Sequence, residues 1–189
     1  MGQCISSVSM CQYNRPRYNN QRLKQATFDS VDVFEPPSGK CKVLDAYDVD
    51  TMRVALPMPD GTLAKFTIRL LHVDGPERKP SKSSTLHDLE KQAAMRCRAK
   101  VLTMVTNTIT SLDFTEASAK DECGKSTKIL RMDGKMFDKY GRILATLHTT
   151  GKNGFCINQR LIDEGWVRSY EGGTRKPWTK KELNNILKK

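Results

Sequence analysis

Residues 63–77 read LAKFTIRLLHVDGPE, and this stretch decides how the surrounding sequence is interpreted. From Ala64 to Leu70, apolar side chains alternate with polar ones, which is the pattern of a half-buried β-strand. Arg69 interrupts the otherwise apolar run that ends this strand, and a buried cation is costly unless it meets an anion. The sequence then presents two carboxylates, Asp74 and Glu77, on a Gly-Pro turn. This predicts a strand that ends in a charged site, with a surface salt bridge of Arg69 as the alternative.

Strict alternation would place Arg69 and Asp74 on opposite faces of the strand. The two side chains can serve one site only if a bulge or a sharp bend follows Leu71. We therefore expect the barrel strand to end near Leu71 and the chain to turn there.

The sequence around this strand has the punctuation of a small barrel. A turn at 59–61 joins two strands into a hairpin over residues 51–74. A helix is expected to begin after Thr85, which would be its N-cap with Asp88 three residues on, and to run to about residue 105. A short helix is expected over 156–164, ended by Gly165. A third helix has a capping box formed by Thr179 and Glu182. Further strands are expected at 42–48, 108–114, from 128 to a turn at 133–134, and 142–148, with a polar loop over 120–127.

These elements predict a mainly β protein with flanking helices (α+β): a five-stranded OB-type barrel with about three helices. Residues 1–40 are rich in Asn, Gln, Arg and Tyr and lack an apolar period, so we expect a flexible tail and linker. Residues 41–189 are expected to form the folded domain.

The composition narrows the class of partner. The 189 residues carry 32 Lys and Arg against 21 Asp and Glu, a net charge of +11, which favours nucleic acid or an anionic membrane surface. A basic protein with no such partner is the plain alternative. No apolar run approaches the roughly 18 residues of a membrane span. The six cysteines have no zinc-finger spacing and are expected to be reduced, intracellular thiols.

The first six residues, MGQCIS, fit the pattern for N-myristoylation of Gly2. Cys4 would accept a palmitoyl group, and two acyl chains hold a protein on a membrane where one is marginal. This predicts association with the inner leaflet, on the cytoplasmic face of the plasma membrane. Without acylation the expected location is the cytoplasm, and an ordinary disordered N-terminus is the alternative.

Two more segments concentrate charge at expected strand ends. Asp48-Val49-Asp50-Thr51 places two carboxylates two residues apart, where repulsion favours a bound cation and hard oxygen ligands suit calcium or magnesium. Residues 138–142, DKYGR, place two cations and an aromatic ring on a turn, which suits phosphate and base contacts. Each segment alone is weak evidence.

Together, in this order and at these separations, the three segments resemble the staphylococcal nuclease family. Its hallmarks are an acid–x–acid–Thr step, an Arg-led strand ending in Asp-x-Pro-Glu, and Asp-Lys-Tyr-Gly-Arg. The resemblance runs from about Cys41 to Tyr170 and leaves out the N-terminal tail. It implies a calcium-dependent nuclease with an OB-type barrel.

The resemblance also implies a metal site. Asp50 and Asp74 would ligate calcium directly, together with the backbone carbonyl of Gly75. Asp48 and Thr51 would act through bound waters in the outer shell.

The chemistry implied by the resemblance is hydrolysis of DNA and RNA, single-stranded by preference, to leave 3′-phosphate ends. Glu77 would be the general base that activates water. Arg69 and Arg142 would clamp the phosphate, a role that suits the planar and permanently charged guanidinium. Lys139 and Tyr140 would contact the nucleotide, and the protein is expected to act as a monomer.

The sequence departs from the family pattern at two positions. Val49 stands where the family commonly has glycine, which could shift Asp48, and Gly75 stands in place of a common Thr. Tyr170 lies near the family's base-stacking tyrosines, in an uncertain register.

Two other functions remain open at this stage. The chain could be a catalytically inactive barrel that binds nucleic acid. It could also be an acylated adaptor at a membrane surface, although that reading gives the acids and arginines no role.

Overall fold

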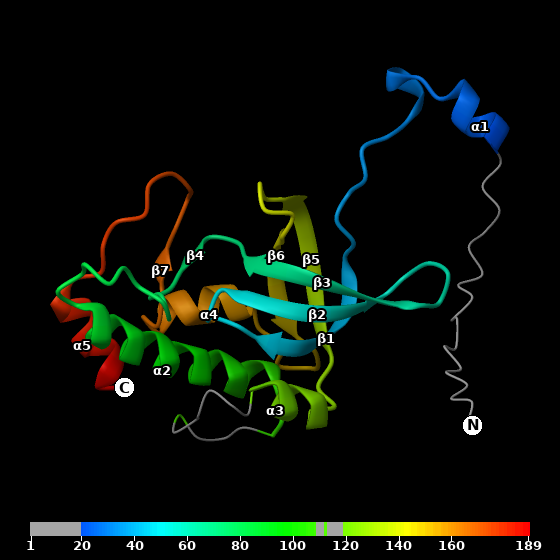
Figure 1. The fold of residues 1–189 in the computed structure, drawn as a ribbon. Coiled ribbons are helices and arrows are strands. Elements are labelled where there is room, and N and C mark those ends of the chain that lie inside the picture. Colours follow the sequence, from blue (N-terminus) through cyan, green and yellow to red (C-terminus); the bar gives the residue numbers. More distant parts are fainter. Residues whose placement is uncertain (1–19, 109–111, 113–118) are drawn as a thin grey trace, which may run out of the picture. The chain divides into compact units, whose positions relative to one another are not determined.

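The computed structural model describes residues 20–108, 112 and 119–189, and these fall into two compact units, one ending at Phe34 and one beginning at Glu35. The first unit contains α1 (Asn20–Gln25) and a 3-10 turn at Phe28–Ser30 (Figure 1). The flexibility predicted for residues 1–40 stays a prediction. In the described residues, no helix is long and apolar enough to cross a membrane.

The second unit is built on a closed five-stranded barrel, which confirms the predicted fold class. Its strands follow the order β1-β2-β3-β6-β5 around the barrel, and β5 pairs with β1 to close it. The pairings are antiparallel except between β3 and β6, which run parallel. The strands are β1 (Gly39–Ala46), β2 (Thr51–Pro57), β3 (Leu63–Leu70), β5 (Leu130–Phe137) and β6 (Ile143–Thr149).

The alternating pattern explains the barrel interior. Met52, Ile68, Leu130 and Leu147 are fully buried, and they come from four different strands. Burying apolar side chains of this size stabilises a fold by about 1.5–3 kcal/mol each relative to exposure. The predicted hairpin is confirmed, because β2 and β3 pair along their full length with Thr51 opposite Arg69.

Helices cover the barrel on the side away from the β2–β3 turn (Figure 1). The long helix α2 packs against both β1 and α5, α3 packs against β1, and α4 packs against β6. Gly165 ends α4 with a positive φ of 64°, and Thr179 and Glu182 form the predicted capping box of α5. The helices are α2 (His87–Val105), α3 (Ala119–Lys125), α4 (Ile157–Asp163) and α5 (Lys180–Leu187).

Two local predictions in the chain after α2 were wrong. The expected loop at 120–127 contains helix α3, whose buried Cys123 and Ala119 pack into the core. The expected turn at 133–134 lies inside β5, where the register with β6 shifts at a bulge between Gly134 and Met136. The strand predicted at 108–114 lies largely outside the described residues.

The predicted start of α2 was also wrong. Its N-cap is Leu86 rather than Thr85, and no side chain caps it. Ser84 Oγ accepts a hydrogen bond from the Leu86 amide at 3.2 Å, and Asp88 pairs with His87 instead of closing a capping box.

Candidate active site

The chain bends sharply after Leu71, as the sequence required. β3 ends at Leu70, His72 takes a left-handed conformation with φ 60°, and the short strand β4 (Val73–Asp74) follows. β4 pairs with β7 (Arg168–Ser169) in a separate two-stranded sheet. The bend therefore takes Asp74 out of the strict alternation of β3 and brings the backbone carbonyl of the preceding Val73 to Arg69.

Arg69 joins the two acidic segments. Its Nη1 forms an ion pair with Asp50 Oδ2 at 2.6 Å, and its Nη2 donates to the carbonyl of Val73 at 3.3 Å. Both side chains are largely buried, with 15% exposure for Arg69 and 7% for Asp50. Thr51 Oγ1 donates to the other Asp50 oxygen at 2.9 Å. The alternative of a surface salt bridge is thus wrong, because this pair lies inside the site.

A second arginine, which sequence reasoning missed, holds the end of the DGPE turn. Arg175 donates from Nε to Asp74 Oδ1 at 2.5 Å and from Nη2 to the carbonyl of Gly75 at 2.8 Å. Its Nη1 is paired with Glu77. Asp74 is almost fully buried, whereas Glu77 is 43% exposed and therefore open to solvent. The only sequence signal for Arg175 was its place in a Gly-rich loop after Tyr170.

Asp48 is the least satisfied member of what we call the acid cluster, namely Asp48, Asp50, Asp74 and Glu77. Burial, and secondarily the charge of Asp50, raises its pKa to about 6, against the lowering effect of nearby arginines. Within the described residues, Asp48 Oδ1 is buried and accepts no hydrogen bond. Arg78 Nε lies 3.9 Å away, too far for one. An additional cation at this position would stabilise the ionised carboxylate.

Two neighbours of the acid cluster were also missed. Arg78 is buried, donates to the carbonyl of Tyr47 at 2.6 Å and lies over the ring of that tyrosine. Glu90, on the first turn of α2, accepts a hydrogen bond from the Glu77 amide at 3.1 Å. Burial and the nearby Asp74 charge raise the pKa of Glu90. Both residues lie outside the segments whose spacing carried the sequence argument.

Arg142 immediately precedes β6, the strand that pairs with β3. Its Nε is paired with Asp138 Oδ2 at 2.7 Å, so in the described part of the chain its ion pair is with Asp138 rather than with the acid cluster. Its guanidinium also lies 5.3 Å from the ring centre of Tyr140, and Lys139 Nζ lies 5.1 Å from the same ring centre. Tyr140 is 71% exposed. A surface hollow at this point is lined by Lys65, Phe66, Thr67, Tyr140, Gly141 and Arg142.

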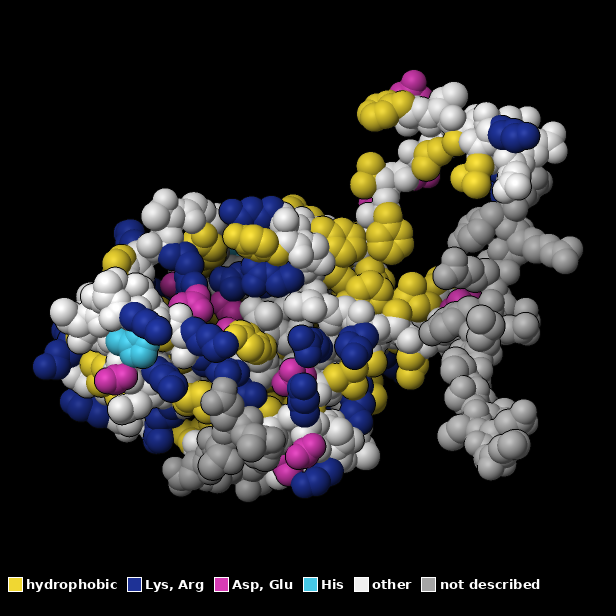
Figure 2. Space-filling model, in the orientation of Figure 1, with side chains coloured by type: hydrophobic (Ala, Val, Ile, Leu, Met, Phe, Trp, Pro, Cys, Tyr) yellow, Lys and Arg dark blue, Asp and Glu magenta, His cyan; other side chains and the backbone are white. Residues whose placement is uncertain are grey.

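The distribution of charge suits a site that binds a polyanion around a small acidic centre. Figure 2 shows a small group of acidic side chains surrounded by Lys and Arg on the visible face of the barrel unit. A basic surface concentrates phosphates, and the acids mark the point where a cation is needed.

Tyr170 is half-buried, and both its amide and its hydroxyl bond backbone carbonyls. Its amide donates to the carbonyl of His72 at 3.1 Å, and its hydroxyl donates to the carbonyl of Gly173 at 2.6 Å. This places Tyr170 at the base of the Arg175 loop, which we define as residues 170–178. Gly2 and Cys4 lie outside the described residues, so their acylation stays a prediction.

The two departures from the family pattern compensate each other. A Cβ at position 75 would lie 2.1 Å from Cγ1 of Val49, which is almost fully buried. Val49 therefore fills the space that a larger residue at position 75 would need. Positions 49 and 75 therefore share one space, which only one of them can fill.

The donor set fits a divalent cation in its chemistry. Asp50 and Asp74 offer carboxylates and Gly75 offers a carbonyl, all hard oxygen ligands. No group of three or more His, Cys, Asp or Glu side chains is arranged to hold a metal ion within residues 20–108, 112 and 119–189. Arg69 and Arg175 engage the two carboxylates instead.

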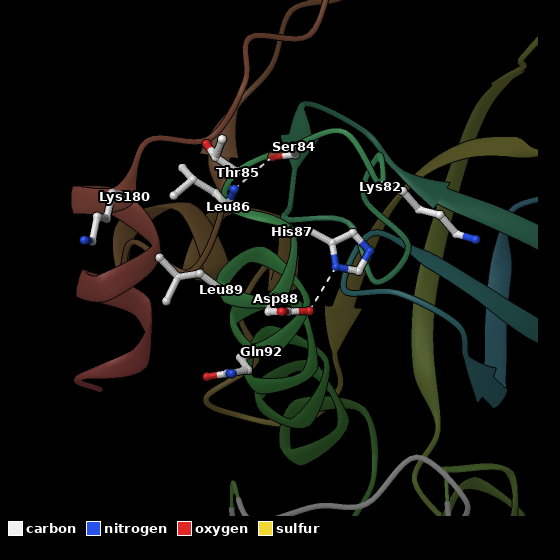
Figure 3. Close-up of a pocket in the computed structure, with 9 residues that line it drawn as sticks. All are labelled: Lys82, Ser84, Thr85, Leu86, His87, Asp88, Leu89, Gln92 and Lys180. Carbon is white, nitrogen blue, oxygen red and sulfur yellow. Dashed lines mark hydrogen bonds and ion pairs between the residues drawn. The ribbon is translucent and has the colours of Figure 1, made fainter.

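A separate hollow lies at the start of α2 (Figure 3). Its lining includes Lys82, Thr85, Asp88 and Lys180 but none of the acid cluster. The dashed contacts in Figure 3 are the Ser84–Leu86 and His87–Asp88 interactions, which are local to the helix start. The hollow therefore belongs to the helix end rather than to the candidate site.

Comparison with known proteins gives one family. A family model described as "Staphylococcal nuclease homologue" matches residues 67–189, which is more than half of the chain. The matched range includes Arg69, Asp74, Glu77 and the DKYGR turn, and it begins after the Asp48–Thr51 step. The comparison with curated proteins found no match.

Proposed function

The chain belongs to the staphylococcal nuclease homologue family, and on that premise we propose that it is a calcium-dependent nuclease. It would hydrolyse phosphodiester bonds of DNA and RNA and leave 3′-phosphate ends. Family membership supports a nuclease-like function. The cofactor, the substrate and the catalytic roles below are the proposal.

The observation that carries the proposal is the convergence at the bend after Leu71. One arginine, Arg69, bonds both Asp50 at the start of β2 and the Val73 carbonyl beside Asp74. The carboxylate of one acidic segment and the backbone next to the carboxylate of the other therefore meet one guanidinium. Phosphodiester hydrolysis needs this combination of cation-binding acids and donors for the phosphate oxygens.

Each residue of the site has a proposed role. Glu77, the most exposed of the acids at the bend, accepts a proton from the water that attacks phosphorus, and the 5′ oxygen departs. Arg69 donates to the phosphate oxygens as their negative charge increases. Arg142 adds a second guanidinium once it releases Asp138. Removing one such donor typically costs about 10²–10³ in kcat.

Asp50, Asp74 and the Gly75 carbonyl would hold the calcium ion, with Asp48 and Thr51 hydrogen-bonded to its waters. When bound, calcium would act as a Lewis acid on the phosphate oxygens. Asp48 Oδ1, which accepts no hydrogen bond in the described residues, and the raised pKa of that carboxyl support a cation at this point.

The substrate surface supports single-stranded nucleic acid. Tyr140 is 71% exposed beside Lys139, so its ring can stack on an unpaired base while the Lys139 ammonium contacts a phosphate. The hollow next to it combines Lys65, Phe66 and Arg142. Tyr170 stays a predicted substrate contact, and the protein is proposed to act as a monomer.

The experiment that tests the proposal is digestion of single-stranded DNA by the purified chain in calcium, in magnesium and in chelator. Glu77→Gln is measured in parallel, with Glu182→Gln as the matched control at an acid outside the site. We expect calcium-dependent cleavage that is lost in Glu77→Gln and kept in the control. Binding of DNA without cleavage in either metal would instead assign the chain as an inactive nucleic-acid-binding barrel.

Membrane tethering is a separate part of the proposal. Myristoylation of Gly2 and palmitoylation of Cys4 would place the nuclease on the cytoplasmic face of the plasma membrane. Metabolic labelling with alkynyl fatty acids tests this, and Gly2→Ala should abolish both the label and membrane association. Label that persists in Gly2→Ala would rule out acylation at this glycine.

A further inference from the structure

The contacts of Arg175 coincide with the proposed ligand set. Its guanidinium is bonded to Asp74 Oδ1, to the Gly75 carbonyl and to Glu77. Asp74 and Gly75 supply two of the three atoms proposed to hold the cation, and Glu77 is the proposed base. One side chain thus engages a large part of the reactive centre.

A guanidinium and a divalent cation cannot share these oxygens. The Asp74 oxygen and the Gly75 carbonyl face the same guanidinium at 2.5 and 2.8 Å, where a calcium ion would need direct contact at about 2.3–2.6 Å. We propose that Arg175 is an internal competitor of the divalent cation, which must leave these oxygens before the cation binds. The proposal rests on the proposed function in one respect, the location of the cation at Asp50, Asp74 and Gly75.

The Arg175 loop is built so that Arg175 can leave while the base of the loop stays in place. On one side, the Tyr170 amide is bonded to the His72 carbonyl. On the other side, Arg168 donates to the carbonyls of Lys176 and Pro177, at 3.0 and 3.1 Å. These bonds fix the ends of the loop. Within it, Glu171 is paired with His72 and the Gly173 carbonyl accepts a hydrogen bond from the Tyr170 hydroxyl, and both contacts are exposed to solvent, where such contacts contribute little.

Two glycines provide freedom within that span. Gly172 and Gly173 both have positive φ, 99° and 86°, and a Cβ at either position would meet open space. Glycine adopts such conformations without steric cost, so the backbone here can reorient locally. Arg175 itself is 34% exposed, compared with 15% for Arg69, and its path to solvent is correspondingly shorter.

Competition of this kind has a definite thermodynamic signature. The affinity of a ligand is lowered by the fraction of molecules in which its site is available. Removing Arg175 should therefore strengthen binding of the cation, whereas removing a residue that positions ligands would weaken it. The direction of the change separates the two roles.

The experiment is titration of the full-length protein with calcium by isothermal calorimetry, in the absence of nucleic acid. The variants are Arg175→Gln, Arg175→Lys and the control Lys176→Gln, an exposed neighbour whose loss changes the net charge equally. We expect Arg175→Gln to bind calcium at least about tenfold more tightly than the parent, with Lys176→Gln within about twofold. Arg175→Lys, which keeps the charge without the fork, should fall between them.

Two outcomes overturn the proposal: an Arg175→Gln affinity equal to that of Lys176→Gln, or one weaker than the parent. A thermal melt of each variant identifies any loss of folding before titration. The double variant Arg175→Gln/Asp74→Asn tests the underlying site, because calcium binding should then be lost. Binding that survives in the double variant would place the cation elsewhere and refute the proposed metal site itself. If the double variant loses binding while Arg175→Gln binds calcium as the parent does, only the competition is refuted.

Discussion

Two arginines of the C-terminal segment each hold a carboxylate, and they do so in different ways. Arg168 bonds Glu182 through Nε at 3.0 Å and Nη2 at 2.7 Å, and it lies 3.9 Å from the ring centre of Trp178. Its remaining donors go to backbone carbonyls of the same segment. Arg175 instead bonds Asp74 and Glu77, which lie about a hundred residues earlier in the chain.

The acids at the two places show opposite pKa shifts. Hydrogen bonds from Arg168, together with those from Thr179, lower the pKa of Glu182 to about 2. In the acid cluster, burial and the Asp50 charge raise the pKa of Asp48 to about 6. A carboxylate with all its partners in place stabilises the fold, and one left short of partners is available to a ligand. The comparison therefore separates a structural ion pair, at Arg168 and Glu182, from an acid cluster in which one buried oxygen of Asp48 accepts no hydrogen bond in the described residues.

The sharpest test of that separation is loss of one arginine from each place. Arg69→Gln removes a donor proposed to bind the phosphate, so kcat/KM on single-stranded DNA should fall about 10²–10³-fold. Arg168→Gln should lower the free energy of unfolding while kcat/KM stays within about tenfold of the parent. Initial rates in calcium and urea melts measure the two effects. Equal losses of activity in both variants would show that the two regions are not separate in function.

The raised pKa of Asp48 predicts a pH dependence of stability. Between about pH 4 and pH 6 the folded protein holds a proton on Asp48 that the unfolded chain has lost, so stability falls as pH rises through this window. The loss should be about 2–3 kcal/mol in chelator, from the linkage of pKa to stability. Asp48→Asn should remove that slope. Urea melts at four pH values measure it, with Glu182→Gln as a control that should keep the slope.

The packing of Val49 against Gly75 predicts a coupled pair of substitutions. Gly75→Thr would force its Cβ against Val49 Cγ1, so the free energy of unfolding should drop by about 1–3 kcal/mol from overpacking. Adding Val49→Gly opens the space, and the double variant should recover part of the loss. A double-mutant cycle by urea unfolding measures the coupling. Additive effects of the two substitutions would contradict the compensation.

The elements with a strong local period could be predicted from the sequence. The strand at 63–70, the β2–β3 hairpin and the α5 capping box were confirmed because alternation, turn residues and cap chemistry act over a few residues. The bend after Leu71 was also predictable, since only a bend reconciles the faces of Arg69 and Asp74. Where the period is short or the helix polar, as at α3, tertiary packing of Cys123 decided the structure.

The site was predictable only where its residues lie in the quoted segments. Asp50 and Arg69 meet because β2 and β3 pair, which the hairpin already indicated. Arg175 and Glu90 enter from a loop and from a helix, through contacts with distant segments. No periodicity or local spacing encodes such contacts. The pairing of Arg142 with Asp138 was missed because the same turn can present Arg142 to a phosphate or hold it in an ion pair with Asp138.

The smallest expected effect tests the structural side of the comparison. Because the pKa of Glu182 is lowered to about 2, the stability that this pair supplies is present above about pH 4.5 and is lost as pH falls toward 2. Glu182 is 38% exposed, so solvent screens the pair and its contribution should not exceed about 1 kcal/mol. Glu182→Gln should lose that increment at neutral pH, and its stability should converge with that of the parent near pH 2. Other carboxyls titrate in the same window, so the difference between the two proteins is the quantity to measure by thermal melting. A difference that stays constant from pH 7 to pH 2 would show that Glu182 stabilises α5 through its packing and capping rather than through its charge.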